Sequence, residues 1–259
     1  EALAKLSERE RDWGTLAEAL EREVAHATTS ETRVRILQKL GALYQDELAD
    51  PASAAKTWRL ILEIDPKHGR ALRALRDALV AARDWDGLED LYAQSGDWES
   101  LADVIGSEAD QTADAAVKIE LSFRAARSFE ERVGAPERAV RSYERVFTVD
   151  PANLTAARAL ANIYEREEKW PRLRAMLDLM LAALPEGRVE ERLALLNRLC
   201  ELSHARLRDG EATFGYAAAA YRIAPSSEDA RAGLELAAET AAAFDRVVGV
   251  APQRRRAPS

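Results

Sequence analysis

The sequence predicts an all-α protein in which antiparallel pairs of helices stack into an α-solenoid. Three observations lead to this fold class. Helix-forming residues dominate the 259-residue chain, which is 32% charged and contains only 12 Gly and 9 Pro. Runs of β-branched residues with the period-2 alternation of strands are missing from it. Finally, three blocks of similar pattern recur along the chain, as expected of a repeat protein.

The recurring blocks cover residues 32–66, 117–151 and 191–225. Each block has a long amphipathic run, a break, a shorter run and a closing proline. A tryptophan lies 53 to 55 residues before each closing proline, which gives the pairs Trp13–Pro66, Trp98–Pro151 and Trp170–Pro225. Because one helical pair cannot bury its apolar face alone, such blocks are expected to stack on their neighbours.

A short phrase, Asp-Trp followed by leucine, occurs twice in close succession, at Asp84-Trp85 and at Asp97-Trp98. The two tryptophans are 13 residues apart, between two equal spacings of 72 residues, Trp13 to Trp85 and Trp98 to Trp170. Half of 72 is close to the ~34 residues of a helix–turn–helix repeat. The phrase therefore predicts a duplicated short helix, with a phase break and a change in superhelical path near residues 84–112.

Capping residues place the helices. Asp84 and Asp97 suit N-cap positions, and Pro51 and Pro136 suit the first helical turn. Pro66, Pro151 and Pro225 are expected to end the preceding helices. The expected helices span residues 14–27, 31–48, 52–64, 68–82, 85–94, 98–109, 114–133, 137–148, 153–168, 171–184, 188–208, 212–223 and 227–244.

Composition also suggests a domain organisation and a location. We expect an α-solenoid over residues 1–243, with sub-blocks 1–96 and 97–243, followed by a flexible basic tail over 244–259. The net charge of −8 argues against nucleic acid as the partner. A single cysteine and no stretch of ~18 apolar residues suggest a cytoplasmic protein without a membrane span. The chain opens with Glu1, which suggests a fragment or a processed product.

The stretch 154–170, "LTAARALANIYEREEKW", resembles the tetratricopeptide repeat (TPR), with Leu160-Ala161, Tyr164 and Trp170 in register. The second helix of the repeat is resembled by residues 138–151 and 53–66, which both end in Asp-Pro. The resemblance covers about residues 13–240. The repeats are divergent, because Arg76 and Thr213 stand where small residues belong and each longer first helix carries one extra residue before the turn.

The resemblance implies a concave groove lined by fixed positions of each first helix. Those positions give a set of candidate partner-binding residues, namely Arg35, Gln38, Arg70, Arg73, Asp77, Arg158, Asn162 and Arg166. Arg158 and Asn162 resemble the pair with which some family members bind a C-terminal carboxylate. Asn197 is out of register in the next repeat, so a complete clamp is not expected. The alternative is that these arginines make i, i+4 pairs on a solvated surface.

Residues that could support catalysis are isolated in the sequence. Cys200 and His204 share a helix face, but no orienting Asp or Asn accompanies them, and a buried small residue is the simpler interpretation of the cysteine. No metal-ligand cluster or phosphate loop is evident, since "GEATFGY" lacks a lysine. The five tryptophans, Trp13, Trp58, Trp85, Trp98 and Trp170, are expected to pack between helices. We therefore expect no enzyme, cofactor or metal.

These observations favour a non-enzymatic scaffold that binds a segment of another protein in its groove. A sensory or regulatory module of a larger protein is an alternative, and an RNA-binding helical repeat is less favoured because of the acidic charge. Self-association through exposed ends of the solenoid is a further expectation.

Overall fold

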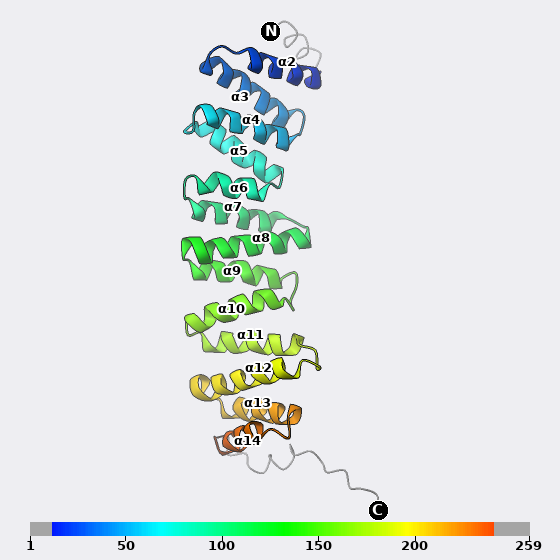
Figure 1. The fold of residues 1–259 in the computed structure, drawn as a ribbon, viewed down its shortest axis with the longest axis vertical. Helices are drawn as coiled ribbons and strands as arrows, with labels where there is room; N and C mark the ends of the chain where they lie inside the picture. Colours follow the sequence, from blue (N-terminus) through cyan, green and yellow to red (C-terminus); the bar gives the residue numbers. More distant parts are fainter. Residues whose placement is uncertain (1–11, 241–259) are drawn as a thin grey trace, which may run out of the picture. The chain divides into compact units, whose positions relative to one another are not determined.

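The computed structural model describes residues 12–240, which are helical nearly throughout (Figure 1). The described residues contain no strand, so the all-α prediction is confirmed. The α-helices are α2 (Trp13–His26), α3 (Ser30–Asp46), α4 (Pro51–Ile64), α5 (Gly69–Ala81), α6 (Trp85–Ala93), α7 (Trp98–Gln111), α8 (Ala115–Arg127), α9 (Pro136–Phe147), α10 (Leu154–Arg166), α11 (Trp170–Ala183), α12 (Val189–Leu202), α13 (Gly210–Ile223) and α14 (Glu228–Thr240). Two π-helical segments, η1 (Ser128–Val133) and η2 (Ser203–Leu207), continue α8 and α12.

The chain divides into two compact units, Glu1–Leu101 and Ala102–Ser259, and α7 begins in the first and continues in the second. In unit 1, each helix from α2 to α6 packs against the next helix of the chain. The same holds in unit 2 from α8 to α14. Each unit is thus a stack of antiparallel helices, which confirms the α-solenoid class.

The capping residues predicted from the sequence act as expected. The carboxylate of Asp84 accepts a hydrogen bond from the backbone N–H of Gly87 at 2.9 Å, and that of Asp97 accepts one from Ser100 at 3.2 Å. Pro51 and Pro136 are the first residues of α4 and α9. Each prediction is explained by the unpaired N–H groups of the first helical turn.

Six turns share one backbone feature. In each of them, the residue two positions before the next helix has a left-handed backbone conformation, with positive φ. These residues are Ala49, Arg83, Gly96, Gly134, Glu168 and Arg208, with φ between 50° and 72°. We call the helix before such a turn a first helix and the helix after it a second helix. The duplicated phrase repeats this turn, because Arg83 precedes Asp84-Trp85 and Gly96 precedes Asp97-Trp98. Helix α6 therefore lies between two such turns. It is the second helix of the pair α5–α6 and the first helix of the pair α6–α7.

The longer first helices contain the expected extra residue, and the backbone hydrogen bond that closes their turn spans one residue more as a result. The N–H of Ala135 donates to the carbonyl of Phe129, and that of Asp209 donates to Ser203, both at 2.9 Å and across six residues. In the shorter helices the matching bond, Asp84 to Leu79 or Lys169 to Tyr164, spans five. The structure therefore corrects two expected helices, 114–133 and 188–208, each of which changes from α to π geometry before its turn.

The small-residue positions allow close helix contact. A Cβ atom on Gly41 of α3 would lie 2.7 Å from Cε2 of Trp58 on α4, so only glycine fits there. Trp58 and Trp85 are buried, which confirms the packing role expected for them, while Trp13, Trp98 and Trp170 are half-buried. Arg76, where a small residue was expected, is half-buried and bonds to Asp77 at 2.7 Å.

Some expectations concern regions that the structure does not describe. The basic tail at 244–259 and the last residues of the expected helix 227–244 lie outside the described residues. The change in superhelical path near 84–112 falls at the boundary between the two units and stays a prediction.

We predict that Gly41→Ala lowers the free energy of unfolding by about 1–3 kcal/mol, because the new methyl group overlaps the rigid Trp58 ring. The matched control is Gly215→Ala in α13, where a Cβ would meet no atom within 4 Å. That change should stabilise the protein by about 0.5–1 kcal/mol through helix propensity. Urea unfolding followed by circular dichroism measures both, and equal effects in the two variants would contradict the close contact.

Candidate partner-binding surface

The eight candidate residues lie on first helices of the two units. Unit 1 holds Arg35 and Gln38 on α3, with Arg70, Arg73 and Asp77 on α5. Unit 2 holds Arg158, Asn162 and Arg166 on α10. All of them are exposed except Gln38, which is half-buried. The candidates thus form two separate surfaces, one in each unit.

In unit 1, Gln38 and His68 connect the two first helices. The side-chain amide of Gln38 lies 2.9 Å from Nε2 of His68. The other ring nitrogen, Nδ1, accepts a hydrogen bond from the backbone N–H of Ala71 and so caps α5. Because Nδ1 accepts, Nε2 carries the proton in the neutral ring, and it donates to Gln38 only when the amide oxygen of Gln38 is turned toward it. Gln38 thus contacts the residue that caps α5, and its role in binding a partner stays a prediction.

Three arginines of the unit 1 surface have no partner among the described residues. Arg35, Arg70 and Arg73 are exposed, and no hydrogen bond or ion pair engages them in residues 12–240. The alternative interpretation, in which they pair along their own helix, is not what the structure shows. Asp77 differs from them, because its carboxylate is bound by Arg76. The exposed side of α5 thus carries two uncompensated positive charges one turn apart.

The unit 2 surface is more fully paired. Arg158 and Asn162 lie one turn apart on α10 and have no partner among residues 12–240. Arg166, by contrast, contacts Glu130 at 2.5 Å, and the neighbouring Glu165 contacts Arg198 at 2.7 Å. Of the three candidates on this surface, Arg158 and Asn162 are therefore the two without a described partner, and their role as half of a carboxylate clamp stays a prediction.

The sequence analysis missed a set of polar contacts that join helices one repeat apart. Arg145 of α9 binds Asp110 of α7 through two bonds, at 2.6 and 3.0 Å, and Arg138 contacts Asp103. Arg174 of α11 binds Asp209 before α13 at 2.8 Å. The partners are 35 residues apart in each case, so opposite charges at the repeat spacing are the signal that could have revealed them. Such exposed pairs contribute roughly 0–1 kcal/mol each, and they mainly fix the register of the repeats.

Tyrosine hydroxyls donate to carboxylates across helix contacts in the same way. Tyr44 donates to Glu21 at 2.6 Å, Tyr143 to Glu130 at 3.2 Å, and Tyr216 to Asp178 at 2.8 Å. Burial, together with the neighbouring carboxylate, raises the pKa of each of these three tyrosines to about 12. These hydroxyls remain protonated donors over the whole physiological range of pH.

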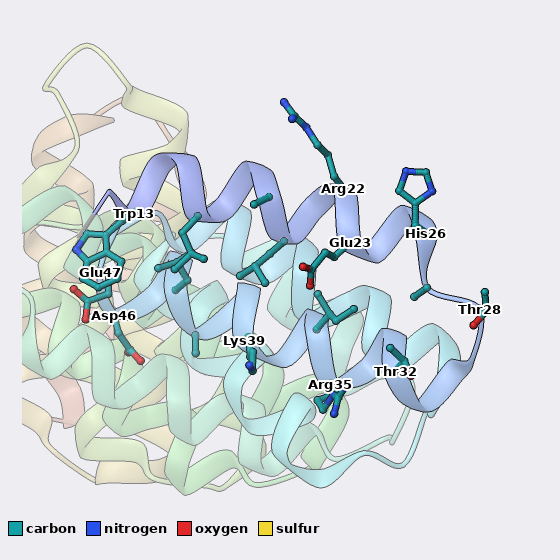
Figure 2. A pocket seen from close by; sticks show the side chains of 17 residues that line it. Trp13, Arg22, Glu23, His26, Thr28, Thr32, Arg35, Lys39, Asp46 and Glu47 are labelled. Carbon is teal, nitrogen blue, oxygen red and sulfur yellow. The ribbon is translucent and has the colours of Figure 1, made fainter. Parts of the chain in front are cut away.

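A groove of about 1010 Å³ runs between α2 and α3 (Figure 2). Its floor is aliphatic, with Leu16, Leu20, Ile36 and Leu43. Its rim is charged, and Trp13 closes one end. Figure 2 shows Asp46 and Glu47 beside Trp13, with Arg35, Thr32 and His26 toward the other end. Sequence analysis did not identify this groove, because it arises from the packing of two helices.

Cys200 and His204 are the remaining candidates for chemistry. The Cys200 thiol is half-buried, its Sγ lies 3.7 Å from the carbonyl of Thr213, and burial raises the pKa of the thiol. His204 is exposed in η2 and is not paired with the cysteine in the described structure. Residues 12–240 contain no group of three His, Cys, Asp or Glu side chains that could hold a metal ion. None of the helices described has both the length and the apolar character that a bilayer crossing requires.

Neither a protein-family model nor a curated protein matches the sequence. Solved structures with a similar helical arrangement include PilF of Pseudomonas aeruginosa, at 14% identity and a TM-score of 0.33, over 92% of this chain and 95% of that chain. The C-terminal part of a TPR repeat-containing protein of Cytophaga hutchinsonii matches at 12% identity and 0.31, over 89% and 98%. The RpL4 assembly chaperone Acl4 matches at 16% and 0.29, over 95% and 96%. Likeness at these TM-scores supports no statement about activity or partner.

The tyrosine contacts predict a specific alkaline instability. A folded-state pKa near 12, above the ordinary value of 10.0, means that the stabilisation is complete below pH 10 and is lost as the pH rises toward 12. Replacing Tyr44, Tyr143 and Tyr216 by Phe should make the fall in melting temperature between pH 10 and 12 less steep. Thermal unfolding across this range tests it, and an unchanged slope in the triple variant would contradict the assignment.

Proposed function

We propose that this protein is a non-enzymatic scaffold of divergent TPR-like repeats that binds an acidic, extended segment of another protein. Each unit has its own binding surface on the exposed sides of its first helices, with Arg70 and Arg73 in unit 1 and Arg158 in unit 2. The observation that carries the proposal is the division among the arginines. Several are held in contacts between repeats, whereas these three are exposed on first helices and have no partner among residues 12–240. Arg141 and Arg222 are exposed and without a described partner as well, but they lie on second helices.

The chemistry of an exposed guanidinium decides what kind of segment would bind. Arginine is always charged and presents a planar set of donors that matches a carboxylate or a backbone carbonyl. A folded protein gains little from an exposed arginine without a partner, so the three side chains are free to bind acidic residues from outside. Their charge contrasts with the net charge of −8, which repels acidic segments elsewhere on the chain. Such contacts are screened by salt, with a Debye length of about 8 Å at physiological ionic strength.

The proposal predicts the effect of reversing the three charges. The variant Arg70→Glu/Arg73→Glu/Arg158→Glu should capture its partners from lysate at least about fivefold less than the wild-type chain, because each contact is worth about 0.5–1 kcal/mol. Raising the salt concentration should reduce capture by the wild-type chain as well. Quantitative mass spectrometry after affinity capture measures both effects.

A matched variant controls for the change in net charge. Lys56→Glu/Arg141→Glu/Arg222→Glu alters the charge by the same amount at exposed positions of the second helices α4, α9 and α13. It should retain its partners. Equal recovery with the two triple variants would show that the exposed sides of α5 and α10 are not the binding surface.

A further inference from the structure

The groove between α2 and α3 has an apolar floor that is largely buried, but less completely than the innermost side chains of the same unit. Leu16, Leu20, Ile36 and Leu43 keep 6–8% of their surface exposed, whereas Leu37 and Ile61, in the same unit, keep 0%. These four side chains come from both helices and form one cluster. They therefore form an apolar strip beneath the groove, and a small part of each side chain reaches solvent.

The groove has the form of a seat for a helix. Elsewhere in unit 1, a single helix lies against two others. Helix α3 packs against α4, and its Gln38 also contacts His68, the residue that caps α5. Helices α2 and α3 form the same kind of two-helix surface, and the groove of about 1010 Å³ lies on it. Arg35 of α3 and Glu47, the C-cap of α3, both line the groove. They are 12 positions apart, which corresponds to about 18 Å at ~1.5 Å per residue. A helix of about three turns would fill this length.

The charges along the groove are ordered. At one end the rim carries Arg35 and Lys39 with one carboxylate, Glu23. Arg22 points away from the groove (Figure 2) and pairs with Glu18. At the other end, beside Trp13, the rim carries Asp46 and Glu47, and no cation is present among the described residues that line this end (Figure 2). These two carboxylates lie at the C-terminal end of α3, where the helix dipole makes negative charge unfavourable. The stability of α3 therefore does not explain their position.

We infer that this groove binds an amphipathic helix of a partner protein, oriented parallel to α3, with acidic residues in its first half and basic residues in its last turn. In this direction the acidic half lies over Arg35 and Lys39, and the basic turn lies over Asp46 and Glu47. The same order of charges also stabilises the dipole of the bound helix. The opposite direction would need a helix whose charges oppose its own dipole. Leucine side chains at positions i, i+3, i+4 and i+7 fill the apolar strip.

This site is separate from the surface of the proposed function. It shares Arg35 with the unit 1 surface, but it uses α2 and the side of α3 that faces α2, whereas the proposed function depends on Arg70, Arg73 and Arg158, which do not line the groove. The variant Arg70→Glu/Arg73→Glu should therefore keep the groove intact. The two ideas can fail independently.

Two synthetic peptides of identical composition test the inference. Both are 14-residue amphipathic helices with the same leucine stripe. The first carries glutamates in its first half and arginines in its last turn, and the second carries them in reverse order. Fluorescence anisotropy with the full 259-residue chain should show at least about tenfold tighter binding of the first peptide. Arg70→Glu/Arg73→Glu should leave this preference unchanged.

A charge-swapped variant makes the test specific to the groove. Arg35→Glu/Lys39→Glu/Asp46→Arg/Glu47→Arg preserves the net charge, and its exposed positions leave the apolar floor untouched. It should reverse the preference between the two peptides. Equal binding of both peptides, or binding of neither, overturns the inference. Two further outcomes would overturn it. Peptide binding that appears only after residues 1–11 are deleted would make this segment the occupant of the groove, and a dimer seen in sedimentation that blocks peptide binding would make a second copy of the chain the occupant.

Discussion

Each described helix buries its apolar side against helices that are near it in the chain, and the rest of the structure depends on this constraint. Gly41 shows how closely the helices must approach, since any side chain at this position would overlap Trp58. The left-handed residue before each second helix fixes where the chain reverses, and the polar contacts one repeat apart fix the register of successive pairs. Because every helix is supported only locally, stability is close to a sum of neighbour terms.

Local support leaves one side of each helix without an internal role, and this gives the surface its capacity to bind. The arginines divide accordingly. Arg145, Arg166 and Arg174 hold repeats together, whereas Arg70, Arg73 and Arg158 are left exposed without a described partner. The aliphatic groove between α2 and α3 arises in a related way, because two packed helices leave a shared side on which a third could lie. The exposed charged residues of both surfaces can change in sequence without cost to the core, whereas the groove floor belongs to the core.

The sequence predicted the helices and turns well because their signals are local. The N-caps Asp84 and Asp97, the first-turn prolines and the duplicated Trp85 and Trp98 phrase act within a few residues of their position. The π-helical ends of α8 and α12 were visible only as one extra residue, since sequence does not say which hydrogen bond will widen.

Contacts between distant positions were harder to predict. Gln38 was assigned to a partner surface but bonds to His68, and Arg166 was assigned to it but pairs with Glu130. In each case the competing group lies about one repeat away, and composition or helix periodicity cannot reveal it. The α2–α3 groove was missed for the same reason, because its shape depends on how two helices pack.

Hydrogen exchange by mass spectrometry on a Leu37→Ala variant tests the central claim of nearest-neighbour support most directly. Leu37 is fully buried in α3, so its truncation should cost about 2–5 kcal/mol locally. Protection should fall in α2 to α5 and remain at the wild-type level from α8 to α13. A uniform loss of protection across both units would show that the chain unfolds as one cooperative core and would contradict the account.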